Sequence, residues 1–286
     1  MTTTLDQTSS KPSGWEQIHS SPLIDFAVWF IRSLLGGRRG ELLISRLGLT
    51  RLRSFYYHAL WYLHYFAQWS LKENQSQGPI VPPKAYYEFG VGSGYTLINY
   101  VEALKAFCKD TGEDFYNYHI FLFDSFEGLP EKKDFRDYSP IYDKGSFAHD
   151  ISEIKNLLIK AGVDLNRETV HFVKGYYEET LKPTTQERFK EYCPRIVTVD
   201  VDYYSSTKIV LDWLEPLLSS GTVFYFDDIW SFHGNPDYGE LAAINEFNRS
   251  ERGFLTPCHI FSGGYLSDSC YIYSKKGIEP EKGTTT

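Results

Sequence analysis

The 286-residue sequence lacks any run of about 20 apolar residues, which excludes a membrane-spanning helix. The segment Met1–Ser21 also lacks the basic start and apolar stretch of a signal peptide. Cysteine is scarce, and no C-x-x-C pair occurs, so neither a zinc framework nor a disulfide scaffold is predicted. The expected compartment is therefore a reducing cytoplasm.

Positive charge is in deficit as well. Lys and Arg total 29 against 37 Asp and Glu, a net charge of −8. This balance argues against a nucleic-acid partner, because phosphates are bound by clustered cations, and it leaves a small ligand open. Aromatic residues are abundant at 17% and supply apolar surface for a sizeable core. The length suits one large domain, alone or with an appendage.

The composition and hydrophobic periodicity of the chain divide it into three regions. Residues 1–20 are expected to be a flexible tail, and residues 21–75 an N-terminal helical cap or lid with helices near 22–35 and 53–72. Aromatic side chains cover most of the second helix, which favours packing on the main domain or an oligomer contact over a lid. A homo-oligomer stays open. The Pro-rich stretch 75–83 leads into the main domain, residues 76–278.

The main domain alternates short apolar runs with helical stretches. Strands are expected near 86–89, 119–123, 170–173, 195–199, 222–226, 258–261 and 269–273, and helices near 96–109, 150–161, 185–192, 208–218 and 238–248. Such alternation predicts an α/β fold with a doubly wound, mostly parallel seven-stranded sheet and helices on both faces. Gly263-Gly264 joins the last two strands without a helix, so they should pair antiparallel at the sheet edge.

Ligands of such sheets bind beyond the carboxyl ends of the strands. The first strand ends in Glu88 and is followed by Gly90, Gly92 and Gly94, with Thr96 opening a helix. Glycines allow a tight turn and close approach to a ligand, and a helix N-terminus offers unpaired N–H groups. The spacing is looser than G-x-G-x-x-G. An ordinary tight turn therefore remains the alternative.

Two later strand ends extend this candidate ligand site. Asp124, followed by Ser125 and Phe126, is suited to accept hydrogen bonds from a ribose diol, with a helix-capping or loop role as the alternative. Gly175 and Tyr176 follow the third strand and are candidates to flank an adenine.

Acidic residues follow the fourth and fifth strands. Asp200 ends one and the pair Asp227-Asp228 ends the next, so neighbouring strands would bring three carboxylates together. Crowded carboxylates raise each other's pKa unless a cation joins them, and oxygen ligands favour Mg²⁺. The alternative is a solvated polar strand end. No H-E-x-x-H, P-loop or G-x-S-x-G motif occurs.

The motifs EFGVGSG, FDSFEGLP, FVKGYYEETL, VDVDYYSST and FDDIW, in this order, resemble the macrocin O-methyltransferase family over roughly residues 80–275. This resemblance implies a Rossmann-like class I methyltransferase fold. It also implies two cofactors, S-adenosyl-L-methionine (SAM) and Mg²⁺. It implies that Glu88, Gly90, Gly92, Gly94 and Asp124 hold SAM. It also implies that Asp200, Asp227 and Asp228 bind Mg²⁺, with Asp200 as general base. The chain departs from the family's usual pattern at Val201, Tyr203 and Ser205.

The expected function is methyl transfer from SAM to a hydroxyl of a small molecule, a sugar or another secondary metabolite. One alternative keeps the fold without the metal and methylates a phenol or carboxylate. A second is a nicotinamide-dependent oxidoreductase, against which the glycine spacing counts. A third is a non-enzymatic interaction protein, against which the acidic cluster counts. The identity of the acceptor is left open.

Overall fold

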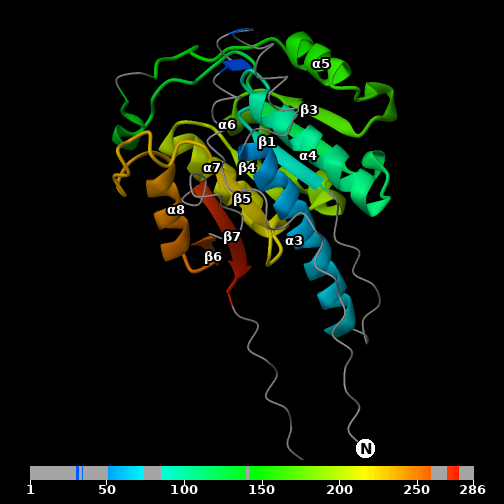
Figure 1. The fold of residues 1–286 in the computed structure, drawn as a ribbon. Helices are drawn as coiled ribbons and strands as arrows, with labels where there is room; N and C mark the ends of the chain where they lie inside the picture. The colour runs from blue at the N-terminus through cyan, green and yellow to red at the C-terminus, as the bar shows by residue number, and fades with distance from the viewer. Residues whose placement is uncertain are drawn as a thin grey trace, which may run out of the picture.

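The computed structural model describes residues 30, 31, 34, 51–73, 85–139, 142–258 and 269–276, with side chains of the first long helix described from 52 to 65 (Figure 1). The predicted tail at 1–20 and the Pro-rich stretch at 75–83 lie outside these residues. Of the helix expected at 22–35, only residues 30, 31 and 34 are described, and they are helical.

A seven-stranded sheet forms the centre of the molecule, in the order β3-β2-β1-β4-β5-β7-β6. Five strands run parallel: β1 (Ala85–Phe89), β2 (His119–Asp124), β3 (Val170–Lys174), β4 (Pro194–Val199) and β5 (Val223–Phe226). Strand β7 (Cys270–Lys275) is antiparallel to both β5 and β6 (Gly253–Pro257). The predicted doubly wound sheet with its antiparallel edge pair is confirmed.

A strand was expected at 258–261; the structure describes only Cys258 of these residues, and Cys258 is not in a strand, whereas 259–261 lie outside the described residues. The sixth strand of the sheet lies earlier in the chain. It begins at Gly253, soon after the preceding helix, because the Asn248 side chain accepts a hydrogen bond from the N–H of Leu255 at 2.8 Å and donates one to its carbonyl at 3.0 Å. Gly253 lies against the ring of Tyr273, where a Cβ would meet the ring at 2.4 Å. A glycine and a proline at its two ends made this strand look like a loop.

Helices cover both faces of the sheet (Figure 1). One face packs against α3 (Arg51–Glu73), α4 (Tyr95–Thr111) and α5 (Ile151–Lys160). The other packs against α6 (Tyr177–Thr180), α7 (Tyr204–Leu214) and α8 (Gly239–Arg249), together with the 3-10 helix η4 (Pro183–Tyr192), where an ordinary helix was expected. Short 3-10 turns complete the loops: η1 (Phe115–Asn117), η2 (Phe135–Asp137), η3 (Leu165–Arg167) and η5 (Glu215–Leu217).

Helix α3 lies along α4 and reaches the sheet (Figure 1). Trp61 contacts Phe107 of α4 with ring centroids 5.3 Å apart, and Phe55 contacts Tyr225 of β5 at 5.6 Å. The described side chains of α3 belong to this packing, and none of them lines the cavity described below. The division into tail, helical cap and main domain stays a prediction. Among the described residues, no helix combines the length and apolarity needed to cross a membrane.

Candidate active site

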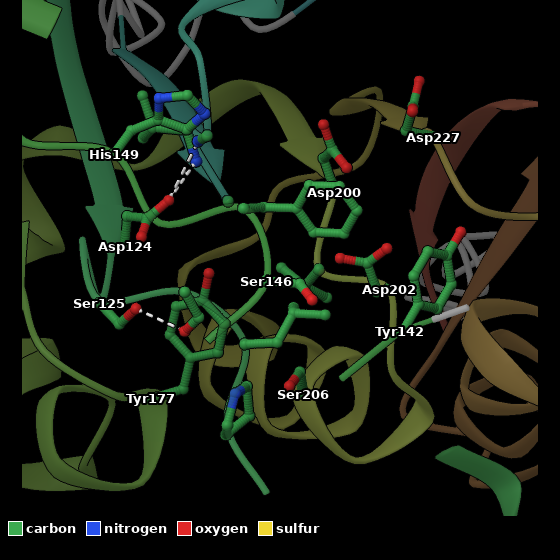
Figure 2. Close-up of a pocket in the computed structure, with 18 of the residues that line it drawn as sticks. Asp124, Ser125, Tyr142, Ser146, His149, Tyr177, Asp200, Asp202, Ser206 and Asp227 are labelled. Carbon is green, nitrogen blue, oxygen red and sulfur yellow. Dashed lines mark hydrogen bonds between the residues drawn. The ribbon is translucent and has the colours of Figure 1, made fainter. Parts of the chain in front are cut away.

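A cavity of about 470 Å³ opens at the carboxyl ends of β1, β2, β4 and β5. Figure 2 shows Asp124 on one side of it, and Asp200, Asp202 and Asp227 on the other. Its remaining wall comes from the glycine turn after β1, the loop after β2 and the loop after β3. The cavity therefore lies where a parallel sheet is expected to bind its ligand.

The glycine turn is shaped by a close contact between two strand ends. Gly90 has φ +82°, and a Cβ there would lie 1.7 Å from the carbonyl oxygen of Asp200. The Asp200 N–H donates to the carbonyl of Phe89 at 2.9 Å, so the chain after β1 crosses directly beside the end of β4. Only glycine fits this crossing. Gly94, with φ +77°, is the N-cap residue of α4 and provides no side-chain cap.

Asp124 organises the turn from the neighbouring strand. Its Oδ2 accepts hydrogen bonds from the N–H groups of Val91 at 2.7 Å and Gly92 at 3.1 Å (Figure 2). Its Oδ1 accepts one from the N–H of Phe126 at 2.6 Å. The same carboxylate lines the cavity. Asp124 thus has the loop role that was the alternative to ribose binding. Its carboxylate also lines the cavity, so it could contact a ligand there.

The predicted SAM-binding residues divide into two groups. Those that line the cavity are Gly90, Gly92, Thr96, Asp124, Ser125, Gly175 and Tyr176, and those that do not are Glu88, Gly94 and Phe126. Glu88 is wholly buried behind the turn, where its Oε2 accepts a hydrogen bond from the hydroxyl of Tyr86 at 2.7 Å. Burial raises the pKa of Glu88 to about 8. Their roles in SAM binding stay predictions.

The three acidic residues predicted at the strand ends all line the cavity, and Asp202 joins them. Burial, followed by repulsion from Asp227 and Asp228, raises the pKa of Asp200 well above its usual range. Burial and the charge of Asp228 raise the pKa of Asp202 to about 8. The cavity thus gathers carboxylates whose charged forms are destabilised.

Each carboxylate of the Asp227-Asp228 pair is held by neighbours. The hydroxyl of Tyr225 donates to Asp227 Oδ1 at 2.5 Å. Asp228 Oδ1 accepts from Ser231 Oγ at 2.7 Å, and its Oδ2 accepts from the N–H of Asp202 at 3.1 Å. The side chains are therefore oriented by hydrogen bonds from several elements.

Sequence reasoning missed three participants. Asp202 lines the cavity and has φ +60°, a left-handed backbone conformation. It lies beyond the end of β4, so the alternation of that strand does not predict where its side chain points. Glu240, at the start of α8, is wholly buried and accepts a hydrogen bond from the N–H of Asp228 at 2.8 Å. Tyr142, in the loop after β2, donates to Ser231 Oγ at 3.0 Å. The D-x-D spacing was the one available signal, for Asp202.

The described residues contain no group of three His, Cys, Asp or Glu side chains that holds a metal-binding arrangement as it stands. The donor set is nevertheless suited to a hard cation, because buried Asp228, half-buried Asp200 and exposed Asp227 are carboxylates that line one cavity, and the charge of Asp227 raises the pKa of the other two. No coordination geometry follows from these side-chain positions. The Mg²⁺ site stays a prediction.

Comparison with known proteins adds to this geometry. The sequence model of the macrocin-O-methyltransferase (TylF) family matches residues 83–257. The chain belongs to the macrocin-O-methyltransferase family. It is a SAM-dependent O-methyltransferase, as the resemblance implied, and the family assignment decides against the nicotinamide-dependent and non-enzymatic alternatives.

Two solved structures of methyltransferases share the fold of this family member. CalS11, a calicheamicin methyltransferase, is 22% identical with a TM-score of 0.56, and the match covers 94% of this chain and 100% of that one. The O-methyltransferase NovP is 18% identical with a TM-score of 0.52, covering 88% and 99%. No curated protein matches the sequence significantly.

Proposed function

We propose that this macrocin-O-methyltransferase family member transfers a methyl group from SAM to a sugar hydroxyl of a small molecule, with Mg²⁺ held by Asp200, Asp227 and Asp228. One observation carries the proposal: the glycine turn after β1 and the carboxylates after β4 and β5 line the same cavity. A donor beside the turn and an acceptor beside the carboxylates would face each other there.

The donor half of the cavity suits SAM. Gly90 and Gly92 leave space for close approach, and Asp124 presents a carboxylate that can accept hydrogen bonds from a ribose diol. Gly175 and Tyr176 line the same cavity and are the residues expected to flank the adenine. Alignment of methyl, sulfur and acceptor oxygen is the main contribution expected from these residues, worth about 7–11 kcal/mol in well-oriented reactions.

The carboxylate half suits Mg²⁺ and an acceptor hydroxyl. When bound, the ion would draw acceptor oxygens together and lower the pKa of the attacking hydroxyl. Asp200 would accept the hydroxyl proton as the oxygen–carbon bond forms and the carbon–sulfur bond breaks. Asp202 is a second candidate for that role, because it lines the same wall and lies outside the proposed ligand set.

Charge narrows the acceptor. Neither Lys nor Arg is among the described residues that line the cavity. The lining includes six carboxylates: Asp124, Glu178, Asp200, Asp202, Asp227 and Asp228. His149 is the one imidazole among the described lining residues. No Lys or Arg on the described wall could pair with an anionic acceptor, so the wall favours an uncharged hydroxylated molecule.

Asp200→Asn tests the assignment. Turnover with a panel of hydroxylated glycosides should be abolished, whereas calorimetric affinity for S-adenosylhomocysteine should stay within about threefold, because the donor half is untouched. Asp143→Asn, at an exposed carboxylate paired with Lys132, is the matched control and should retain full turnover. Full turnover by Asp200→Asn would refute the base and metal roles. Turnover that survives a chelator would instead favour the metal-independent alternative.

A further inference from the structure

Tyr225 and Asp227 lie two residues apart at the end of β5, so their side chains leave the sheet on the same face. That face is the one covered by α3 and α4. Tyr225 is 5% exposed and points into this core, whereas Asp227 lines the cavity. A tyrosine of the core thus stands directly behind a carboxylate of the site.

The contact between them is short and polar. The Tyr225 hydroxyl donates to Asp227 Oδ1 at 2.5 Å, the length of a charge-assisted hydrogen bond. This bond occupies one oxygen and fixes the rotation of the carboxyl group, which leaves Oδ2 for other partners. Removal of the hydroxyl would free Asp227 to rotate among several orientations.

The ring of Tyr225 is in turn held by α3. Phe55, which is wholly buried, contacts it with ring centroids 5.6 Å apart and planes inclined at 41°. The next residue, Tyr56, reaches β4, where its hydroxyl lies 2.6 Å from Thr198 Oγ1. Thr198 precedes Asp200 by two residues. Two adjacent residues of α3 therefore support the strands that carry Asp227 and Asp200.

Helix α3 lies outside the residues that match the family, 83–257, so these contacts belong to the part of the chain that the family match leaves unexplained. We propose that Tyr225, held by Phe55 of α3, is a positioning residue that orients Asp227 toward the bound Mg²⁺. The inference rests on the proposed function, because it assigns a purpose to a carboxylate of the proposed metal site.

Tyr225→Phe tests the inference, with Tyr273→Phe as the matched control. Tyr273 is buried in the adjacent strand β7, and its hydroxyl has no hydrogen-bond partner among the described residues. Binding of Mn²⁺, used as a paramagnetic substitute for Mg²⁺, is followed by electron paramagnetic resonance, and binding of S-adenosylhomocysteine by calorimetry. Neither measurement needs the acceptor.

Tyr225→Phe should bind Mn²⁺ about tenfold more weakly or worse, as found when groups that orient metal ligands are removed. Its affinity for S-adenosylhomocysteine should change less than about twofold, because the donor half is untouched. Tyr273→Phe should match the wild type in both. Phe55→Leu keeps the hydroxyl but loosens the ring, so it should weaken Mn²⁺ binding in the same direction by a smaller factor, and it decides the matter if Tyr225→Phe does not fold.

The opposing outcomes are distinct. If the wild type binds no Mn²⁺, the proposed metal site fails and the inference fails with it. If the wild type binds Mn²⁺ and Tyr225→Phe binds it equally well, the inference alone is overturned. If Tyr225→Phe loses S-adenosylhomocysteine and Mn²⁺ together, Tyr225 has a general structural role and the inference is likewise overturned.

Discussion

Replacement of Gly90 by alanine is the sharpest test of how the site is built. The new Cβ would lie 1.7 Å from the carbonyl oxygen of Asp200, where real Cβ atoms essentially never come closer than 3.0 Å to a neighbour. The obstacle is backbone, which cannot swing aside as a flexible side chain would. The ends of β1 and β4 must therefore separate by more than an ångström.

The cost has two parts. Alanine at φ +82° costs about 1–2 kcal/mol relative to its preferred conformations. Forced overpacking typically costs a further ~1–3 kcal/mol. Gly92 supplies the matched control, because it lines the same cavity with φ +45° but has nothing within 4 Å of an added Cβ. Gly92→Ala should therefore show only the first part.

Urea unfolding measures the loss of stability, and a turnover assay with a panel of hydroxylated glycosides measures the loss of activity. Gly90→Ala should lose about 2–5 kcal/mol of unfolding free energy, and Gly92→Ala about 1–2 kcal/mol. A displacement of about 1 Å at a reacting group can cost about a hundredfold in rate, so turnover by Gly90→Ala should fall by that order. Equal losses of unfolding free energy in the two variants would refute this account of the crossing between β1 and β4.

Three further changes probe neighbouring features. Burial raises the pKa of Glu88 from its ordinary 4.5 to about 8, so the folded state resists its deprotonation. Wild-type stability should fall relative to Glu88→Gln as pH rises across that window, and parallel stability curves in metal-free buffer would contradict this. Buried Asp137 accepts backbone hydrogen bonds from three N–H groups, including that of Ser205 at 2.8 Å. Asp137→Asn turns an amide donor toward one of these N–H groups and should lower the free energy of unfolding in urea by about 1–3 kcal/mol. A change within error would count against a stabilising role for these hydrogen bonds. Asp124→Ala releases the glycine turn, so S-adenosylhomocysteine should bind at least about tenfold more weakly by calorimetry, and unchanged affinity would remove Asp124 from the site.

The sheet could be predicted because its strands carry a local signal. Short apolar runs separated by helical stretches determine a parallel sheet, and strand ends in such a sheet meet at one edge. The sequence therefore sufficed to predict that Asp200, Asp227 and Asp228 lie at one edge of the sheet. Strand β6 was not predicted at 253–257, because Gly253 and Pro257 at its two ends are residues more typical of loops. Its position depends on the hydrogen bond from the N–H of Leu255 to the side chain of Asn248.

The remaining parts of the site depend on contacts between distant segments. Glu240 reaches the backbone N–H of Asp228 only because α8 packs behind it. Tyr225 meets Asp227 only because alternate residues of β5 share one face. Asp202 reaches the cavity through a left-handed backbone conformation that its neighbours in sequence do not signal. The spacing of motifs in a sequence can predict which side chains follow strand ends. It cannot predict side chains that reach the site through packing between distant segments.

The central claim is that this family member binds the SAM donor beside a carboxylate site for Mg²⁺. Calorimetric titration of the purified protein with S-adenosylhomocysteine, with and without Mg²⁺, tests it most directly. The account predicts micromolar binding, and it then reduces the open question to a screen of hydroxylated acceptors. An absence of binding in both conditions would contradict it.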